Sequence, residues 1–174
     1  MGLLVELAGM VKEKLSTPLD VVLSYSNMTL QNSTLLDALP KLYEAGVQKI
    51  LTASPLSMGL LRSAGPQPWH PATQSQKEAV QKAVVYVEQQ GDNLADTSMR
   101  FVFAKWSGCV IGGWSSIKEL EDAVTMWHLV KSGVQTEQDE KLWNGARQVM
   151  GTEVDTMWSS PGKGWIFKDG TRVE

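Results

Sequence analysis

Val47-Gln-Lys-Ile-Leu-Thr-Ala-Ser-Pro-Leu-Ser-Met-Gly-Leu-Leu61 runs without a break from a strand-like segment into a turn, and it is the most informative part of this chain. Residues 47–53 form a short apolar run of the kind that is buried on both faces in a parallel sheet. Pro55 stiffens the exit from this strand, and Gly59 lets the backbone turn toward a ligand. Because an irregular loop with several more prolines follows, the stretch predicts an α/β fold with a functional loop after one strand.

Two further strands and six helices are predicted around this segment. Residues 19–24 and 109–112 are short apolar runs typical of buried strands. Apolar spacing and end signals predict helices from Leu3 to Leu15, from Asn32 or Ser33 to Gly46, from Thr73 to Gly91, from Asn93 to Gly108, from Ser116 to Gly133 and from Thr136 to Met150. Thr73 with Gln76 and Ser116 with Glu119 fit the capping-box pattern. In the helix that starts at Ser116, we expect Leu120, Val124 and Trp127 to face the core.

The order of these elements predicts the fold class. Strands that alternate with helices across short turns form right-handed βαβ units and a parallel sheet. A closed barrel needs eight strands and typically about 250 residues, whereas three strands are predicted here and the chain opens inside a helix. We therefore expect α/β architecture, the C-terminal part of a (β/α)₈ TIM barrel, with a partial barrel domain over residues 1–150 and a C-terminal tail over 151–174 that no pattern explains.

Composition excludes several classes of function. The formal net charge is -3, and lysine and arginine are scattered, so no nucleic-acid partner and no anionic membrane surface is expected. No apolar stretch approaches the roughly 20 residues of a membrane span, and the start lacks a signal peptide, so we expect a cytoplasmic protein. The single cysteine, Cys109, is predicted to be a small buried hydrophobe and to take part in neither a disulfide nor a metal site.

A second segment with the features of a ligand site is Gly112-Gly113-Trp114-Ser115-Ser116. It leads from the third predicted strand straight into a helix, and it offers backbone without Cβ atoms, hydroxyl groups and the unpaired N–H groups of a helix start, where an anion is stabilised. The loops after the last strands of a (β/α)₈ barrel often bind phosphate in this way. The alternative is that Ser116 only caps the helix and the glycines only turn the chain, and the motif alone favours neither.

The loop Ser54-Pro55-Leu56-Ser57-Met58-Gly59 resembles that of the aldo-keto reductases, in which the seventh barrel strand ends in a Ser-Pro-Leu-x-x-Gly loop that folds over the dinucleotide. Residues 20–25 resemble the sixth strand, and residues 110–116 resemble the eighth strand with its phosphate-binding turn. Within the family, Leu23-Ser24-Tyr25, residues 33–37, residues 53–61 and Trp69-His70-Pro71 are similar to the branch of L-galactose and D-arabinose dehydrogenases. The resemblance covers roughly residues 18–130.

This resemblance implies a cofactor, NAD or NADP, and a set of residues that hold it. Ser54, Leu56, Met58, Gly59 and Leu60 would line the pyrophosphate and ribose, Gly113, Ser115 and Ser116 would meet the adenosine-side phosphate, and Glu119 would face adenine. The implied reaction is oxidation of an aldose at C1 to a lactone. The family's Asp, Tyr, Lys and His catalytic set belongs to the first four strands, so we assign no catalytic residue and expect this chain alone to be inactive. The alternative is a non-catalytic partial barrel that binds nucleotide or acts as an interaction module, with self-association through exposed barrel edges.

Several other side chains could serve chemistry or only the structure. Trp69 and His70 could contact the sugar substrate through ring stacking and a hydrogen bond, but a structural or solvent-facing His70 is the stronger expectation. His128 lacks acidic or cysteine neighbours at metal-ligand spacing, so we expect no metal site there. Glu119, Glu121 and Asp122 suit the dipole of the helix that begins at Ser116, and we expect a solvated helix face there rather than a catalytic pair of carboxylates.

Overall fold

Three parallel strands form the sheet of this protein, for which a computed structural model describes residues 1–133, 137–158, 166–168 and 171–173. The strands are β1 (Val21–Tyr25), β2 (Lys49–Ala53) and β3 (Val110–Ile111), and they lie in the order β1-β2-β3. Tyr25 pairs with Ala53, and Ala53 pairs with Ile111, so the carboxyl ends of all three strands lie side by side. The predicted sheet is confirmed, and its loops leave from one common edge.

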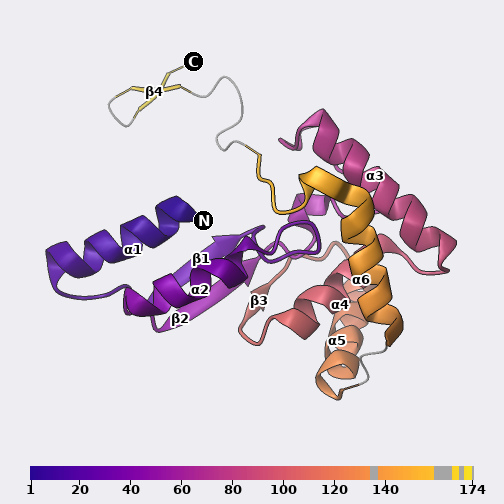
Figure 1. Cartoon of the computed structure of the whole chain (residues 1–174), viewed down its shortest axis with the longest axis horizontal. Coiled ribbons are helices and arrows are strands. Elements are labelled where there is room, and N and C mark those ends of the chain that lie inside the picture. The colour runs from indigo at the N-terminus through magenta and orange to yellow at the C-terminus, as the bar shows by residue number, and fades with distance from the viewer. Residues whose placement is uncertain (134–136, 159–165, 169–170, 174) are drawn as a thin grey trace.

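The helices form two groups around this sheet (Figure 1). They are α1 (Gly2–Leu15), α2 (Thr34–Glu44), α3 (Gln74–Gln89), α4 (Leu94–Lys105), α5 (Ile117–Lys131) and α6 (Glu137–Met150). Figure 1 shows α1 and α2 lying along the strands and α3 to α6 gathered around α4, which contacts α3, α5 and α6. Two short 3₁₀ turns, η1 (Ser57–Gly59) and η2 (Gly151–Glu153), and an antiparallel pair, β4 (Ile166–Lys168) with β5 (Thr171–Val173), complete the described elements. All six predicted helices are present.

Local hydrogen bonds explain where the helices begin. The capping box at the start of α3 is present, because Gln76 N donates to Thr73 Oγ1 at 3.2 Å and Thr73 N donates to Gln76 Oε1 at 3.0 Å. At the start of α2, Ser33 occupies the cap position without a side-chain cap, and Asn32 Oδ1 accepts from Thr34 N at 3.1 Å. Asn32 therefore supplies the capping oxygen. The predicted cap of α6, Thr136, lies outside the described residues.

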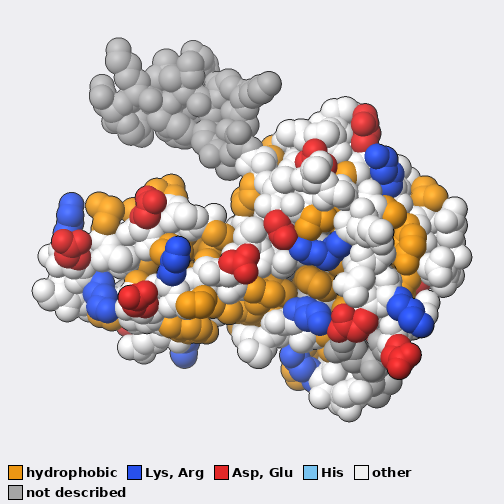
Figure 2. All heavy atoms as spheres, viewed as in Figure 1, with side chains coloured by type: hydrophobic (Ala, Val, Ile, Leu, Met, Phe, Trp, Pro, Cys, Tyr) orange, Lys and Arg blue, Asp and Glu red, His pale blue; other side chains and the backbone are white. Residues whose placement is uncertain are grey.

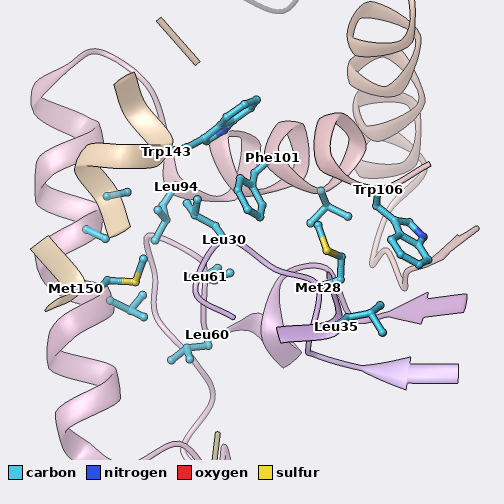
Figure 3. Close-up of a cluster of buried hydrophobic side chains, with 14 of the residues drawn as sticks. Met28, Leu30, Leu35, Leu60, Leu61, Leu94, Phe101, Trp106, Trp143 and Met150 are labelled. Carbon is cyan, nitrogen blue, oxygen red and sulfur yellow. The ribbon is translucent and has the colours of Figure 1, made fainter. Parts of the chain in front are cut away.

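The hydrophobic core joins the strand loops to the second group of helices (Figure 3). Met28 and Leu30 enter it from the loop after β1, and Leu60 and Leu61 enter it from the loop after β2; all four are fully buried. They meet α4 and α6 residues, among them Leu94, Phe101 and Trp143. A fully buried side chain of this size contributes about 1.5–3 kcal/mol, so both loops are fixed by their own core residues.

The burial of the sheet differs from the prediction. On β1, Val21, Leu23 and Tyr25 are 48%, 44% and 51% exposed and alternate with the buried Val22 and Ser24. The prediction of strands buried on both faces is therefore wrong for β1, because α1 and α2 cover only one face of the sheet. Cys109 is exposed rather than buried, since it directly precedes β3, the strand at the edge.

The inward face of α5 was also predicted wrongly. Leu120, Val124 and Trp127 are exposed, and the buried side chain of this helix is Ala123. Ala123, together with the partly buried Met126 and Val130, packs against Met99 and Phe103 of α4. Both sets of residues are apolar and lie at helical spacing on α5, so apolar spacing alone does not decide which of them faces α4.

Residues 151–158 pack back onto the strand loops. Gln31 Nε2 donates to Glu153 O at 2.6 Å and to Thr156 O at 3.1 Å, and Ser33 N donates to Asp155 Oδ1 at 2.7 Å. Arg147 of α6 reaches the same segment through an ion pair with Asp155 at 2.7 Å. The loop after β1 and the end of α6 are thus held together by polar contacts, while the division of the chain at residue 150 stays a prediction.

Candidate functional site

The loop after β2 is held in an unusual backbone conformation. Ser54, Ser57 and Met58 have positive φ angles of 61°, 49° and 56°, which non-glycine residues seldom adopt. Ser54 Oγ accepts a hydrogen bond from Met58 N at 2.8 Å, and Ser54 N donates to Ile111 O at 3.0 Å. Such conformations cost of order 1–3 kcal/mol each and are common at ligand-binding sites, so the loop is a candidate for one.

The turn after β3 is organised by the start of α5. Glu119 N donates to Ser116 Oγ at 3.2 Å, so Ser116 is the helix cap, as the sequence predicts. The Glu119 carboxylate folds back and accepts from both Ser115 N and Ser115 Oγ at 2.8 Å. The backbone N–H of Ser115, then its hydroxyl, and also the charge of Arg62 hold the pKa of Glu119 below its usual range. The N–H and hydroxyl groups of Ser115 in this turn are therefore already bonded to the Glu119 carboxylate.

One cavity of about 430 Å³ lies between these two segments and the helices α4 and α5. Eight of the residues predicted from the sequence line it: Ser54, Leu56, Met58, Gly59, Trp69, Gly113, Ser115 and Glu119. The volume is within the range of small-molecule and cofactor sites. The parallel register explains the convergence, because neighbouring parallel strands deliver their loops to the same edge of the sheet.

Three predicted site residues lie outside the cavity wall. Leu60 is fully buried in the core, where it anchors the loop, and the Ser116 hydroxyl is engaged as the helix cap. His70 is only 3% exposed. Their contact with a cofactor or a substrate stays a prediction.

His70 is fixed by hydrogen bonds to both ring nitrogens. Ala72 N donates to Nδ1 at 3.0 Å, which makes Nε2 the protonated nitrogen, and Nε2 lies 2.9 Å from the carbonyl oxygen of Ser57. Burial lowers the pKa of His70, against the opposing effect of the Ser57 hydrogen bond, and the charge of Lys77 lowers it further. The neutral ring therefore supports the backbone of the loop after β2, the structural role that the sequence favoured.

Several cavity residues were not predicted: Arg62, Gln67, Asp96, Met99, Trp114, Asp122 and Met126. Arg62 lies just after the loop that follows β2, and Trp114 lies within the turn Gly112–Ser116. Both could have been predicted as cavity residues because they adjoin predicted site residues. Asp96 also has a local role, since its N–H donates to Asn93 Oδ1 at the start of α4, and this role conceals its place in a cavity. The positions of Met99 and Met126 depend on how α4 and α5 pack.

Two kinds of feature are absent from the described residues. In the part of the chain that the structure describes, no three histidine, cysteine, aspartate or glutamate side chains are grouped so that they could hold a metal ion. Among the described helices, none combines the length and the apolar character that crossing a bilayer requires.

Comparison with known proteins places these segments in a family. The sequence profile of the Aldo/keto reductase family matches residues 4–144. L-galactose dehydrogenase from Arabidopsis thaliana is 40% identical over 106 residues, which are 60% of this chain and 33% of that protein. D-arabinose 1-dehydrogenase from Saccharomyces cerevisiae is 38% identical over 117 residues, which are 66% of this chain and 35% of that protein. The chain thus spans about a third of the length of these relatives.

Solved structures agree on the fold. The apo form of an aldo-keto reductase from Bacillus halodurans superposes with a TM-score of 0.53 at 15% identity, covering 88% of this chain and 50% of that structure. Its holo form gives a TM-score of 0.51 at 16% identity. The three parallel strands and their helices are therefore part of a (β/α)₈ barrel, as the sequence predicts. The profile match covers most of the chain, and the protein belongs to the aldo/keto reductase family.

Proposed function

We propose that this chain provides the dinucleotide-binding part of an NAD- or NADP-dependent oxidoreductase. The observation that carries the proposal is the convergence of two separate segments, residues 54–59 and residues 113–119, on one cavity. Both segments resemble the cofactor-binding loops of the family, and they are far apart in the sequence. A shared cavity is the arrangement that an extended dinucleotide requires.

The chemistry of the cavity supports a ligand of this class. Arg62 offers a positive charge and fixed donor geometry for a pyrophosphate beside the Ser54 loop. An added Cβ at Gly113 would meet nothing within 4 Å, so the backbone there is open to a ligand. Leu56, Met99 and Met126 supply apolar wall for the flat parts of a nucleotide. When bound, the nicotinamide would accept a hydride.

The substrate class is proposed from the relatives. Two of them are named as dehydrogenases of the sugars L-galactose and D-arabinose. In the whole protein, we propose that an aldose loses a hydride from C1 to the cofactor and a proton from the C1 hydroxyl, which leaves a lactone. Trp69, 66% exposed at the cavity wall, offers an indole face to the sugar ring, and His70 holds the neighbouring loop.

The test of cofactor binding is a calorimetric titration of the chain with NAD and with NADP. Gly113→Leu places a side chain in the cavity without a predicted folding cost, so we expect it to weaken binding by at least about tenfold, or about 1.4 kcal/mol. Gly9→Leu is the matched control, because an added Cβ there also meets nothing within 4 Å and α1 lies away from the cavity. Unchanged affinity in Gly113→Leu would contradict the assigned turn.

A second measurement tests whether this chain lacks the catalytic residues. No residue of this chain is assigned to proton transfer, so the pure chain mixed with aldose and cofactor should give no absorbance change from reduced nicotinamide. Measurable turnover would show that the chain contains catalytic groups of its own.

A second candidate function is that of an interaction module. The observation in its favour is the uncovered sheet face, where Leu23, Tyr25 and Ile111 are each at least 41% exposed. Such a face can associate with a second copy of the chain. We rank it below cofactor binding because it does not explain the strained loop around Ser57.

A further inference from the structure

Trp158, in the segment that follows α6, packs against the histidine that supports the loop after β2. The Trp158 ring meets the His70 ring edge-on, with 4.9 Å between the ring centroids and an angle of 69° between the ring planes. Trp158 also packs, partly buried, against the hydrophobic core. None of the described residues 151–158 lines the cavity, so an effect of this segment on a ligand has to pass through His70.

His70 connects Trp158 to two parts of the cavity wall. Its Nε2 lies 2.9 Å from the carbonyl oxygen of Ser57, which directly precedes the cavity residue Met58. Its ring also stacks on Trp69, another cavity residue, with 6.1 Å between the centroids and 27° between the planes. A stacked ring and an edge-on ring together favour one orientation of the imidazole, the one that bonds Ser57.

The loop around Ser57 needs this support because its backbone conformation is costly. Ser54, Ser57 and Met58 all have positive φ angles, and such conformations persist only where neighbouring contacts hold them. When a site has its binding conformation for only a fraction of the time, its apparent affinity is reduced by that fraction. A contact that keeps the loop in place therefore raises the affinity of the cavity for its ligand.

Hydrogen bonds outside the cavity fix the segment that carries Trp158. Thr156 Oγ1 accepts from Gln76 Nε2 at 2.9 Å. The carbonyl oxygen of Thr156 accepts from Gln31 Nε2 at 3.1 Å and from Asn32 Nδ2 at 3.2 Å. Gln31, Asn32 and Gln76 are each only 1% exposed, so the loss of these bonds would be costly. The segment is thus anchored to the loop after β1 and to the start of α3 without any ligand.

We propose that Trp158 is a positioning residue of the cavity, through which residues 151–158 hold the loop after β2 in its binding conformation and strengthen dinucleotide binding. The inference rests on the proposed dinucleotide function. It has a reciprocal consequence, because two coupled sites change each other's binding free energy by the same amount. A dinucleotide in the cavity therefore stabilises residues 151–158, although they do not line the cavity.

The test is a calorimetric titration of the whole chain with NAD and with NADP. Trp158→Leu keeps an apolar side chain but removes the ring edge, and we expect it to weaken the binding of each dinucleotide at least about threefold. Trp158→Phe keeps an aromatic edge, so it should restore most of the lost affinity.

Amide exchange reports on the loop itself. The Met58 N–H donates to Ser54 Oγ at 2.8 Å, so its exchange rate measures how often the loop opens. This rate should rise in Trp158→Leu and stay close to the original in Trp158→Phe. In the unmodified chain, NAD should slow amide exchange in residues 151–158.

Trp127→Leu is the matched control. The Trp127 ring also meets a histidine ring, that of His128, edge-on with 4.9 Å between the centroids, but neither residue lines the cavity. The same loss of an edge-on contact there should leave the dissociation constants and the exchange of Met58 unchanged.

Thr156→Val is a second variant, which leaves both rings in place. It removes the hydroxyl that accepts from Gln76 and so loosens the segment from the start of α3. We expect weaker dinucleotide binding and faster exchange of Met58, as in Trp158→Leu. Thr156→Ser keeps the hydroxyl and should bind like the unmodified chain.

The possible outcomes separate this inference from the proposed function. Dinucleotide binding that Trp158→Leu and Thr156→Val leave unchanged overturns the role of the segment while leaving the dinucleotide site in place. Weaker binding without faster exchange of Met58, or an equal loss of affinity in Trp127→Leu, overturns the action of Trp158 through the loop. Failure of the unmodified chain to bind NAD or NADP overturns the proposed function and this inference together.

Discussion

A single neutral imidazole, that of His70, fixes the loop that forms one wall of the cavity. Its Nδ1 accepts a hydrogen bond from Ala72 N, its Nε2 donates to Ser57 O, and its ring stacks on Trp69 and meets Trp158 edge-on. Ser57 belongs to the part of the loop with positive φ angles. Because protonation would remove the acceptor at Nδ1 and place a charge in a buried site, the loop depends on the protonation state of this ring.

Stability should accordingly fall as the solution becomes acidic. The pKa of His70 is lowered in the folded protein, mainly by burial. The ordinary pKa of histidine is about 6.5, so below that pH His70 is protonated in the unfolded chain but still neutral in the folded chain. Folding then requires the loss of a proton. The stability that His70 contributes above about pH 6.5 is therefore lost as the pH falls toward the pKa of the folded protein. Urea unfolding between pH 7.5 and 5 should show this loss, with a slope of at most about 1.4 kcal/mol per pH unit for one proton.

His70→Gln is the diagnostic variant, because glutamine can donate to Ser57 O but does not titrate in this range. It should flatten the part of the pH profile that His70 contributes, while His128→Gln, which changes an exposed histidine, should keep the profile of the unmodified protein. A His70→Gln profile as steep as the original would assign the pH dependence to other groups.

At the scale of elements, the sequence predicted helix starts better than helix faces. Thr73 and Gln76, or Ser116 and Glu119, lie within one turn of each other, so their hydrogen bonds depend on local spacing alone. Which stripe of α5 is buried depends on α4, through Met99 and Phe103, and no local pattern contains that information. The packing of residues 151–158 could not be predicted for the same reason, because they form hydrogen bonds with residues more than a hundred positions earlier in the chain.

The contacts of Asp155 allow a test of that long-range packing. Its carboxylate accepts from Ser33 N at the start of α2 and pairs with Arg147 of α6. We expect Asp155→Ala to lower the free energy of unfolding by about 1 kcal/mol, comparable to the loss of a helix cap, because it removes the acceptor for Ser33 N and a partly exposed ion pair. Amide exchange should also become faster in residues 151–158.

Asp37→Ala provides the comparison, since it removes an exposed aspartate from the first turn of the same helix, α2. It should cost less stability and leave exchange in residues 151–158 unchanged. Equal effects of the two substitutions would mean that Asp155 acts only through its charge near the helix start.

At the scale of the whole molecule, the parallel arrangement and the shared strand edge could be predicted, and with them two of the segments that line the cavity. The sequence did not predict which faces of the strands and helices stay exposed to solvent. Hydrophobicity patterns report that a strand is apolar, but they do not report whether both of its faces are packed. Figure 2 shows hydrophobic side chains reaching the surface in several places on the side of the molecule that it presents, including the region of α1 and α2.

The uncovered sheet face makes a prediction about behaviour in solution. Leu23 and Ile111 are 44% and 41% exposed on the two outer strands of the sheet, so contact between two such faces would bury apolar surface, which stabilises by about 25 cal/mol per Å². We expect the chain to associate with rising concentration in sedimentation velocity experiments. Leu23→Lys should weaken that association, and it should change the free energy of unfolding by less than about 1 kcal/mol, because the side chain is half exposed already.

Leu15→Lys makes the same chemical change at a position on α1 that is 69% exposed and lies outside the sheet. If the sheet face mediates association, this control should sediment like the unmodified chain, while Leu23→Lys shifts toward the monomer. Equal shifts for the two variants would point to general hydrophobicity as the cause. No association over a wide concentration range would remove the basis for an interaction module and leave cofactor binding as the remaining proposal.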